Sequence, residues 1–223
     1  MLRRKRIASA IIFILALVMT AGCSKVSKDK GYTAVYEGEY MRVYNDGSLM
    51  VEYAEKFDEN EYSITELEKM VTDEISEFNS EYSKDNGMSL DSVKEEDGIA
   101  KVRLNFATVK DYVVYNNVYV NSEKKMEFFV GTYKEAKEKK YKFDCDFYKA
   151  ESNKLDKKKL DIDDILEAED SEKLMVINTT HGVTMRVEGT IKYVTGDVKM
   201  KNDSAFTSNE DDNYIIYLME DKE

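Results

Sequence analysis

The sequence predicts an α+β fold: an antiparallel sheet with hairpins and a long amphipathic helix, followed by a small all-β C-terminal region. Asp-Gly steps at 46–47 and 97–98 each separate two runs rich in β-branched and aromatic residues, which is typical of hairpins. Residues 63–82 repeat apolar side chains at steps of three and four, the period of a helix. After residue 170, short apolar runs recur between glycines, which is typical of short strands.

The first half of the chain is predicted as hairpin, helix, hairpin. Residues 32–57 form two strands joined at Asn45-Asp46-Gly47, because glycine tolerates a positive φ. The helix over 63–82 opens with Ser63 and Glu66 at the spacing of a capping box. A second hairpin joins 88–96 to 99–106. One face of the helix carries Ile64, Leu67, Val71, Ile75, Phe78 and Tyr82.

The middle of the chain is predicted to contain a short helix at 108–117, a strand at 126–130 and a helix at 132–140 opened by Thr132 and Glu135. The charged run 150–159 is interpreted as a boundary. One or two helical turns follow at 161–167, and then strands at 174–177, 183–187, 190–195, 198–201 and 214–218. The predicted division is 1–22, 23–31, an α+β domain at 32–150 and a mainly β region at 151–223, with the independence of the last region left open.

Composition limits the function classes. The 223 residues include 33 Lys+Arg and 45 Asp+Glu, for a net charge of −12, and 42% of them are hydrophobic. The apolar content is sufficient for a packed core, and the acidic balance argues against a nucleic-acid partner, which would need a basic surface. One His and two Cys provide no cluster for a structural zinc ion, so we expect no metal and no cofactor.

The N-terminal segment is typical of a secretory signal peptide. Arg3, Arg4, Lys5 and Arg6 precede the apolar run 7–20, and small residues then lead to Cys23. The 16 residues from Ile7 to Gly22 would make a helix of roughly 24 Å, shorter than the ~30 Å hydrocarbon core of a bilayer. We therefore expect residues 1–22 to be cleaved and not retained as a membrane span.

The sequence Thr20-Ala21-Gly22-Cys23 resembles the lipobox of bacterial lipoproteins, with Thr20 where leucine is usual. The resemblance implies cleavage between Gly22 and Cys23 and a diacylglyceryl cysteine at Cys23, carrying acyl chains such as palmitate. Two acyl chains give a stable membrane anchor, whereas one gives only reversible binding. The expected location is the outer face of the cell membrane, with the mature chain extracytoplasmic in the cell envelope and residues 23–31 acting as a polar tether.

The mature chain is expected to be strongly acidic. Removing residues 1–22 leaves 29 basic and 45 acidic residues, a net charge of −16 over 201 residues. Cys145 would then be the only free thiol, so the fold must form without an internal disulfide.

The order of elements is similar to that of uncharacterised lipoproteins of low-GC Gram-positive bacteria. The similarity is carried by the runs YAEKFDENEYS, SITELEKMVTDEISEFN, FFVGTYKEAKEKKYKFD and YIIYL, and it covers most of the mature chain. It implies location and gross organisation, and it brings no catalytic or binding residue.

No residue pattern indicates a catalytic or metal site. Cys145 lies between Asp144 and Asp146, which disfavour a thiolate, so pairing with His181 is not expected. Carboxylate pairs arise by chance among 45 acidic residues. The run 209–213 could hold calcium weakly, but a solvated loop is the preferred interpretation.

Two surface features have both a functional and a structural interpretation. Tyr32, Tyr36, Tyr40 and Tyr44 share one face of a strand, either as an aromatic platform for a glycan or peptide, or as a packing face against residues 50–57. The basic clusters 137–142 and 157–159 either touch lipid headgroups or anionic wall polymer, or are solvated charges.

The sequence therefore predicts a membrane-anchored extracytoplasmic lipoprotein that acts as a binding or envelope-support module. Its partners would be the membrane, through the lipid on Cys23, and a glycan, a peptide or an envelope protein. The alternative is a surface hydrolase that uses a carboxylate pair. The sequence indicates neither the ligand nor the oligomeric state.

Overall fold

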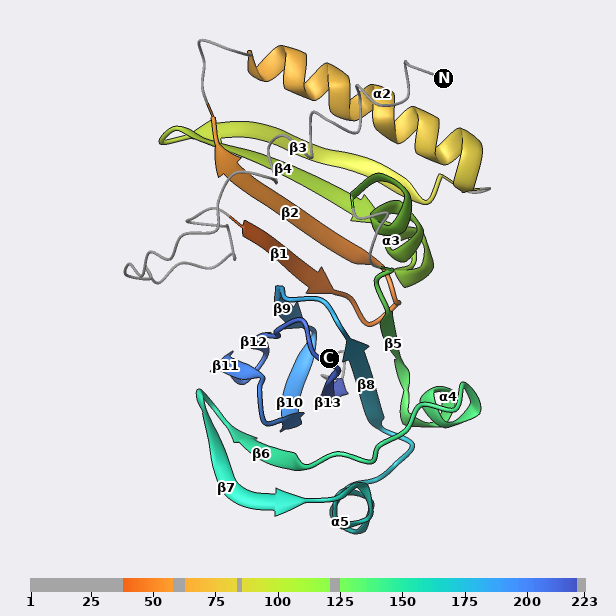
Figure 1. Cartoon of the computed structure of the whole chain (residues 1–223), viewed down its shortest axis with the longest axis vertical. Coiled ribbons are helices and arrows are strands. Elements are labelled where there is room, and N and C mark those ends of the chain that lie inside the picture. Colours follow the sequence, from red (N-terminus) through yellow and green to blue (C-terminus); the bar gives the residue numbers. More distant parts are fainter. Residues whose placement is uncertain (1–37, 58–62, 84–85, 121–124, 220–223) are drawn as a thin grey trace. The chain divides into compact units, whose positions relative to one another are not determined.

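The structure is a computed structural model that describes residues 38–57, 63–83, 86–120 and 125–219 (Figure 1). The chain forms two compact units. Unit 1 contains the described residues up to Tyr40 and those of Met50–Lys125, and unit 2 contains Met41–Leu49 and the described residues from Met126 onward. Residues 126–150, which we expected in the first domain, therefore belong to unit 2.

The predicted fold class, α+β built on a long amphipathic helix, is wrong. Within the described ranges the chain is mostly β, with thirteen strands and only four α-helices. Helix α2 (Ile64–Tyr82) exists where the periodicity predicted a helix, but it is one element among many strands and does not determine the class.

Unit 1 contains four strands in the order β1-β2-β4-β3, although the last part of β1 and the first residue of β2 fall in unit 2. Helix α2 lies along β3 (Figure 1). The strand bounds are Gly38–Val43 for β1, Leu49–Lys56 for β2, Met88–Glu96 for β3 and Ile99–Phe106 for β4.

Both ends of α2 are fixed by side-chain hydrogen bonds. At its start the predicted capping box is confirmed: the Glu66 amide donates to Ser63 Oγ at 3.2 Å, and the Ser63 amide donates to Glu66 Oε2 at 3.0 Å. Near its end, Asn79 Nδ2 donates to the Met88 carbonyl at 2.8 Å, while the Met88 amide donates to Asn79 Oδ1 at 3.0 Å. This pair of bonds ties the last turns of the helix to the first residue of β3.

The two predicted hairpin turns are confirmed. Gly47 and Gly98 have φ of +83° and +75°, which glycine adopts without the strain of a Cβ. In β4, burial alternates residue by residue, with Ala100, Val102, Leu104 and Phe106 on the buried face, as predicted.

The short helix after β4 continues into a π-helical turn that we did not predict. Helix α3 (Val109–Tyr115) begins at Thr108, whose Oγ1 accepts a hydrogen bond from the Asp111 amide at 3.1 Å. The turn η1 (Asn116–Val120) follows directly. Such turns are rare and often lie at functional sites.

The main sheet of unit 2 has six strands in the order β5-β8-β13-β10-β6-β7. Its strand pairs are antiparallel. In the same order, the bounds are Phe128–Thr132, Leu174–Thr179, Asn213–Met219, Gly189–Thr195, Phe147–Glu151 and Lys154–Leu160. Unit 2 also contains three strands outside the six-stranded sheet, β11 (Lys199–Asn202), β12 (Ala205–Thr207) and β9 (Thr184–Val187). Strand β12 pairs antiparallel with β11 on one side and with β9 on the other.

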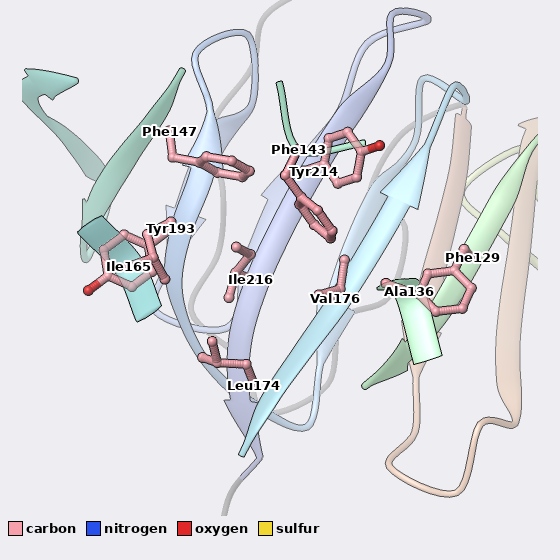
Figure 2. Close-up of a cluster of buried hydrophobic side chains, with 10 residues drawn as sticks. All are labelled: Phe129, Ala136, Phe143, Phe147, Ile165, Leu174, Val176, Tyr193, Tyr214 and Ile216. Carbon is pink, nitrogen blue, oxygen red and sulfur yellow. The ribbon is translucent and has the colours of Figure 1, made fainter. Parts of the chain in front are cut away.

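Helices α4 (Tyr133–Glu138) and α5 (Ile162–Ala168) each begin with a capping box, Thr132 with Glu135 and Asp161 with Asp164. They contribute Ala136 and Ile165 to the core cluster on the six-stranded sheet, shown in Figure 2. The remaining members of the cluster are Phe129, Phe143, Phe147, Leu174, Val176, Tyr193, Tyr214 and Ile216.

The charged run 150–159 is not a simple linker, because most of it lies in the hairpin β6–β7. Strand β7 has one neighbour in the six-stranded sheet and is therefore an edge strand, with most of its side chains exposed. Lysines are tolerated at such an edge and discourage pairing with another chain. Alternation of apolar residues is consequently absent from β7, and this is why periodicity did not reveal the strand.

Candidate functional site

Unit 1 contains a cluster of buried polar side chains that the sequence analysis did not single out. We call it the tyrosine–glutamate cluster. Its members come from five elements and share phenol, carboxyl or amide groups: Glu39 of β1, Tyr53 of β2, Glu74 of α2, Tyr112 and Tyr115 of α3, and Asn116 of η1. With the exception of Glu39, which is half-buried, these residues are at most 5% exposed.

Two tyrosine hydroxyls of the cluster donate to carboxylates. Tyr115 Oη donates to Glu74 Oε1 at 2.6 Å, and Tyr112 Oη donates to Glu39 Oε1 at 2.5 Å. Asn116 Nδ2 donates to the Tyr112 carbonyl at 3.1 Å. These bonds join α3 to α2 on one side and to β1 on the other.

The position of Glu74 explains its burial. It lies three residues after Val71 and four before Phe78, so it occupies the same helical face as the apolar residues. Our sequence analysis grouped only the apolar members of this face and passed over a carboxylate within it. The signal was present, since an acidic residue at a core position of a helix is unusual unless it is paired.

Burial changes the protonation of the cluster. It raises the pKa of Glu74 from 4.5 to about 7; the hydrogen bond from Tyr115 opposes this rise, and the charge of Glu77 adds to it. Burial also raises the pKa of Tyr112 and of Tyr115, and the nearby glutamates strengthen the effect. Glu74 is therefore partly protonated near neutral pH, while the phenols stay neutral.

The third tyrosine of the cluster, Tyr53, has a buried hydroxyl that forms no hydrogen bond within the described part of the chain. Burial raises its pKa, as do the charges of Glu39 and Glu74, whereas the side chain of Asn116 lowers it. The Asn116 side chain is therefore the polar neighbour of the Tyr53 hydroxyl, although the two do not form a hydrogen bond of standard geometry.

The arrangement connects secondary-structure elements and does not present a reactive group to solvent. A carboxyl with a pKa near neutrality can serve as a general acid or base. Glu74 is, however, only 2% exposed, so its carboxyl is covered by the core of unit 1. The cluster is best described as a buried polar network that fixes α2, α3 and η1 relative to one another.

The predicted tyrosine series lies partly within the structure. Tyr32 and Tyr36 are outside the described residues, as are Gly22 and Cys23. Tyr40, in β1, and Tyr44, just after it, are both half-buried. The guanidinium carbon of Arg42 lies 5.0 Å from the centre of the Tyr44 ring. Whether the four tyrosines form a binding platform stays a prediction.

The surroundings of Cys145 raise the pKa of its thiol and so disfavour the reactive thiolate. Burial raises its pKa to about 11, and the charges of Asp212, Asp146 and Asp144 contribute. The backbone of His181, which lies in the turn before β9, forms two hydrogen bonds. Its amide donates to Thr179 Oγ1 at 3.0 Å, and its carbonyl accepts from Ser208 Oγ. The carboxylates around Cys145 act in the direction that the sequence predicted.

The acidic loop 209–213 is organised by its own side chains. Asn213 Nδ2 donates to Asn209 Oδ1 at 2.7 Å and to the Asp211 carbonyl at 2.6 Å. The Asp211 amide donates to Asn209 Oδ1 at 3.0 Å. Within the ranges that the structure describes, no group of three or more His, Cys, Asp or Glu side chains is arranged to hold a metal ion.

Among the described residues, no helix has both the length and the apolar character needed to cross a membrane. Comparison of the chain with protein-family models, with curated proteins and with solved structures gives no match.

Proposed function

We propose that this chain is an extracytoplasmic lipoprotein, anchored in the outer face of the cell membrane through Cys23, and that its two β-rich units act as a binding module. The observation that carries the proposal is the order of the first 23 residues: a basic start, the apolar run 7–20 and then Thr20-Ala21-Gly22-Cys23. The basic start and the apolar run would engage the export machinery. The small residues Ala21 and Gly22 would leave room beside the Cys23 thiol for lipidation and cleavage.

The body of the protein is compatible with this location. Cys145 is a free cysteine in the described part of the chain, so no disulfide of that cysteine is required for folding. The acidic surface of the mature chain would be repelled by an anionic membrane face, and this repulsion favours presentation away from the lipid. A tether at Cys23 would then supply the attachment that the body itself does not favour.

Metabolic labelling with palmitate tests the anchor. The wild-type chain should incorporate label and Cys23→Ala should not. The chain has only one other cysteine, and Cys145→Ala is therefore a matched control that should keep full labelling. Label retained in Cys23→Ala, or lost from a folded Cys145→Ala protein, would contradict the proposal.

A further inference from the structure

The connection between α2 and β3 contains Asn86-Gly87, the only asparagine in the sequence that is followed by glycine. Asn86 is exposed and has a φ of +51°, a left-handed conformation that asparagine tolerates better than most other residues. The backbone nitrogen after an asparagine can attack the side-chain amide, and glycine leaves that nitrogen unshielded because it has no side chain. The connection therefore presents a step with intrinsic covalent reactivity.

Packing requires glycine at position 87. Gly87 is buried, and a Cβ there would lie 2.5 Å from the carboxyl group of Asp111 and 2.6 Å from Ser83 Oγ. The Gly87 carbonyl also accepts a hydrogen bond from the Ala107 amide at 2.8 Å, which links this backbone to the residue after β4. A larger residue, which would shield the nitrogen, does not fit here, so the fold itself retains the reactive step.

One hydrogen bond restrains the nitrogen that would react. The Gly87 amide donates to Ser83 Oγ at 2.7 Å, and Ser83 is the C-cap residue of α2. Attack on the side chain of Asn86 requires the amide to give up its proton and to turn toward Asn86 Cγ. Because both changes break the bond to Ser83, the strength of this bond sets how often the nitrogen is free to react.

We propose that Asn86 is a site of spontaneous deamidation, and that the hydrogen bond from the Gly87 amide to Ser83 Oγ controls its rate. The Gly87 nitrogen bonds to Asn86 Cγ and loses its proton, and the Cγ–Nδ2 bond breaks so that Nδ2 leaves with that proton as ammonia. Solvent water then opens the resulting succinimide ring at either carbonyl, which gives aspartate or isoaspartate at position 86. This inference is independent of the proposed membrane anchor.

The products change both the charge and the backbone of the connection. Either one adds a carboxylate beside Gly87, where the Asp111 carboxyl already lies, and close to the C-terminal end of α2, which carries a partial negative charge. Isoaspartate also adds one carbon to the main chain before Gly87, and so displaces Met88 from its two hydrogen bonds with Asn79. We therefore expect the isoaspartate form to unfold at a lower temperature than the unmodified chain.

The test uses the purified full-length chain, folded in detergent and incubated at mildly alkaline pH, with peptide mapping by mass spectrometry at intervals. Deamidation replaces NH by O, so the peptide that contains Asn86 should gain mass steadily. Asp46-Gly47 and Asp97-Gly98 can form the same ring, but water regenerates them without a change in mass, so they do not contribute to the signal. Asn86→Gln should abolish the gain, because glutamine would have to close a larger ring.

The role of the hydrogen bond is tested with a matched pair of variants. Ser83→Ala removes the hydroxyl that holds the Gly87 amide and should speed deamidation of the folded chain by about twofold to tenfold. Ser80→Ala, an exposed change near the end of the same helix, should keep the rate within about 1.5-fold of the wild type. Thermal unfolding of each variant establishes that it is folded.

The chain unfolded in urea provides the reference rate. Without the bond to Ser83, the wild type should deamidate faster than it does when folded, and Ser83→Ala should react at the same rate as the wild type. This comparison of folded and unfolded wild type needs no variant, so it tests the inference even if Ser83→Ala does not fold.

Three results would overturn the inference. No mass gain at Asn86 in the folded wild type, while the unfolded chain reacts to completion, would show that the folded protein has no deamidation site there. Equal rates in folded Ser83→Ala and folded wild type, or in folded and unfolded wild type, would remove the hydrogen bond from control of the rate. An equal acceleration of Ser83→Ala in urea would assign the effect to the local sequence and not to the fold.

Discussion

Replacing Glu74 by glutamine is expected to stabilise unit 1 at alkaline pH and to have little effect at acidic pH. Glutamine has the shape of a protonated glutamate and keeps a carbonyl oxygen to accept the hydrogen bond from Tyr115 Oη. It cannot ionise. The variant therefore removes only the cost of placing a negative charge in the tyrosine–glutamate cluster.

The magnitude follows from the pKa of Glu74, which burial raises from 4.5 to about 7. The difference between these values corresponds to about 3.5 kcal/mol, at about 1.4 kcal/mol for each pKa unit. Because the pKa is higher in the folded state, the folded protein binds the proton more tightly than the unfolded chain does. The stability that this proton provides is fully present below pH 4.5 and is lost as the pH rises through about 7.

Urea unfolding followed by circular dichroism, at several pH values between about 5 and 8, measures this effect. The free energy of unfolding of Glu74→Gln minus that of the wild type should become more positive by about 2.5 kcal/mol across this range. Glu68→Gln, an exposed change on the same helix, should give a difference that varies by less than about 0.5 kcal/mol. A pH-independent difference for Glu74→Gln would refute the reasoning, because it would show that Glu74 has the same pKa in both states.

Two further predictions concern the scaffold. Gly189→Ala should destabilise unit 2 by more than about 2 kcal/mol in thermal unfolding, because a Cβ at this position would lie 2.2 Å from the Leu218 carbonyl oxygen. Gly182→Ala is the control and should change stability much less, because the nearest atom to its Cβ would be 3.6 Å away. Equal losses of stability in the two variants would contradict this account. Ser63→Ala should lower the free energy of unfolding by about 1 kcal/mol, because it removes the cap of α2. Ser80→Ala, at an exposed site inside the helix, is the control and should leave stability nearly unchanged. An unchanged stability in Ser63→Ala would show that the cap does not stabilise the helix.

Local signals in the sequence identified the elements that form within a few residues of chain. The capping boxes at Ser63 and Thr132 and the glycine turns at Gly47 and Gly98 are all present in the structure. Each depends on a side chain or backbone angle that acts on its own neighbourhood, so a single sequence is sufficient to recognise it.

The fold class could not be read in the same way because it depends on distant pairing. Strand β5 pairs with β8, with Val130 opposite Ile177, and no periodic pattern encodes a partner so far along the chain. The lysine-rich strand β7 lacks alternation because it lies at an edge. Residues 126–150, which we expected in the first domain, therefore lie in unit 2, and the described part of the chain is mostly β.

The tyrosine–glutamate cluster was missed for a related reason. Tyr53, Glu74 and Tyr115 come from separate elements, and their polar groups meet only when those elements pack together. The one local sign was Glu74 on the apolar face of its helix. The predicted anchor at Cys23, in contrast, is a property of consecutive residues and needs no tertiary structure to be proposed.

The most direct test of the anchor is mass spectrometry of the amino terminus of the protein recovered from its native host. We predict that the mature chain begins at Cys23, that its mass includes a diacylglyceryl group, and that it is recovered with the membrane fraction. A chain that retains residues 1–22, or one recovered from the cytosol with an unmodified cysteine, would contradict the proposed function.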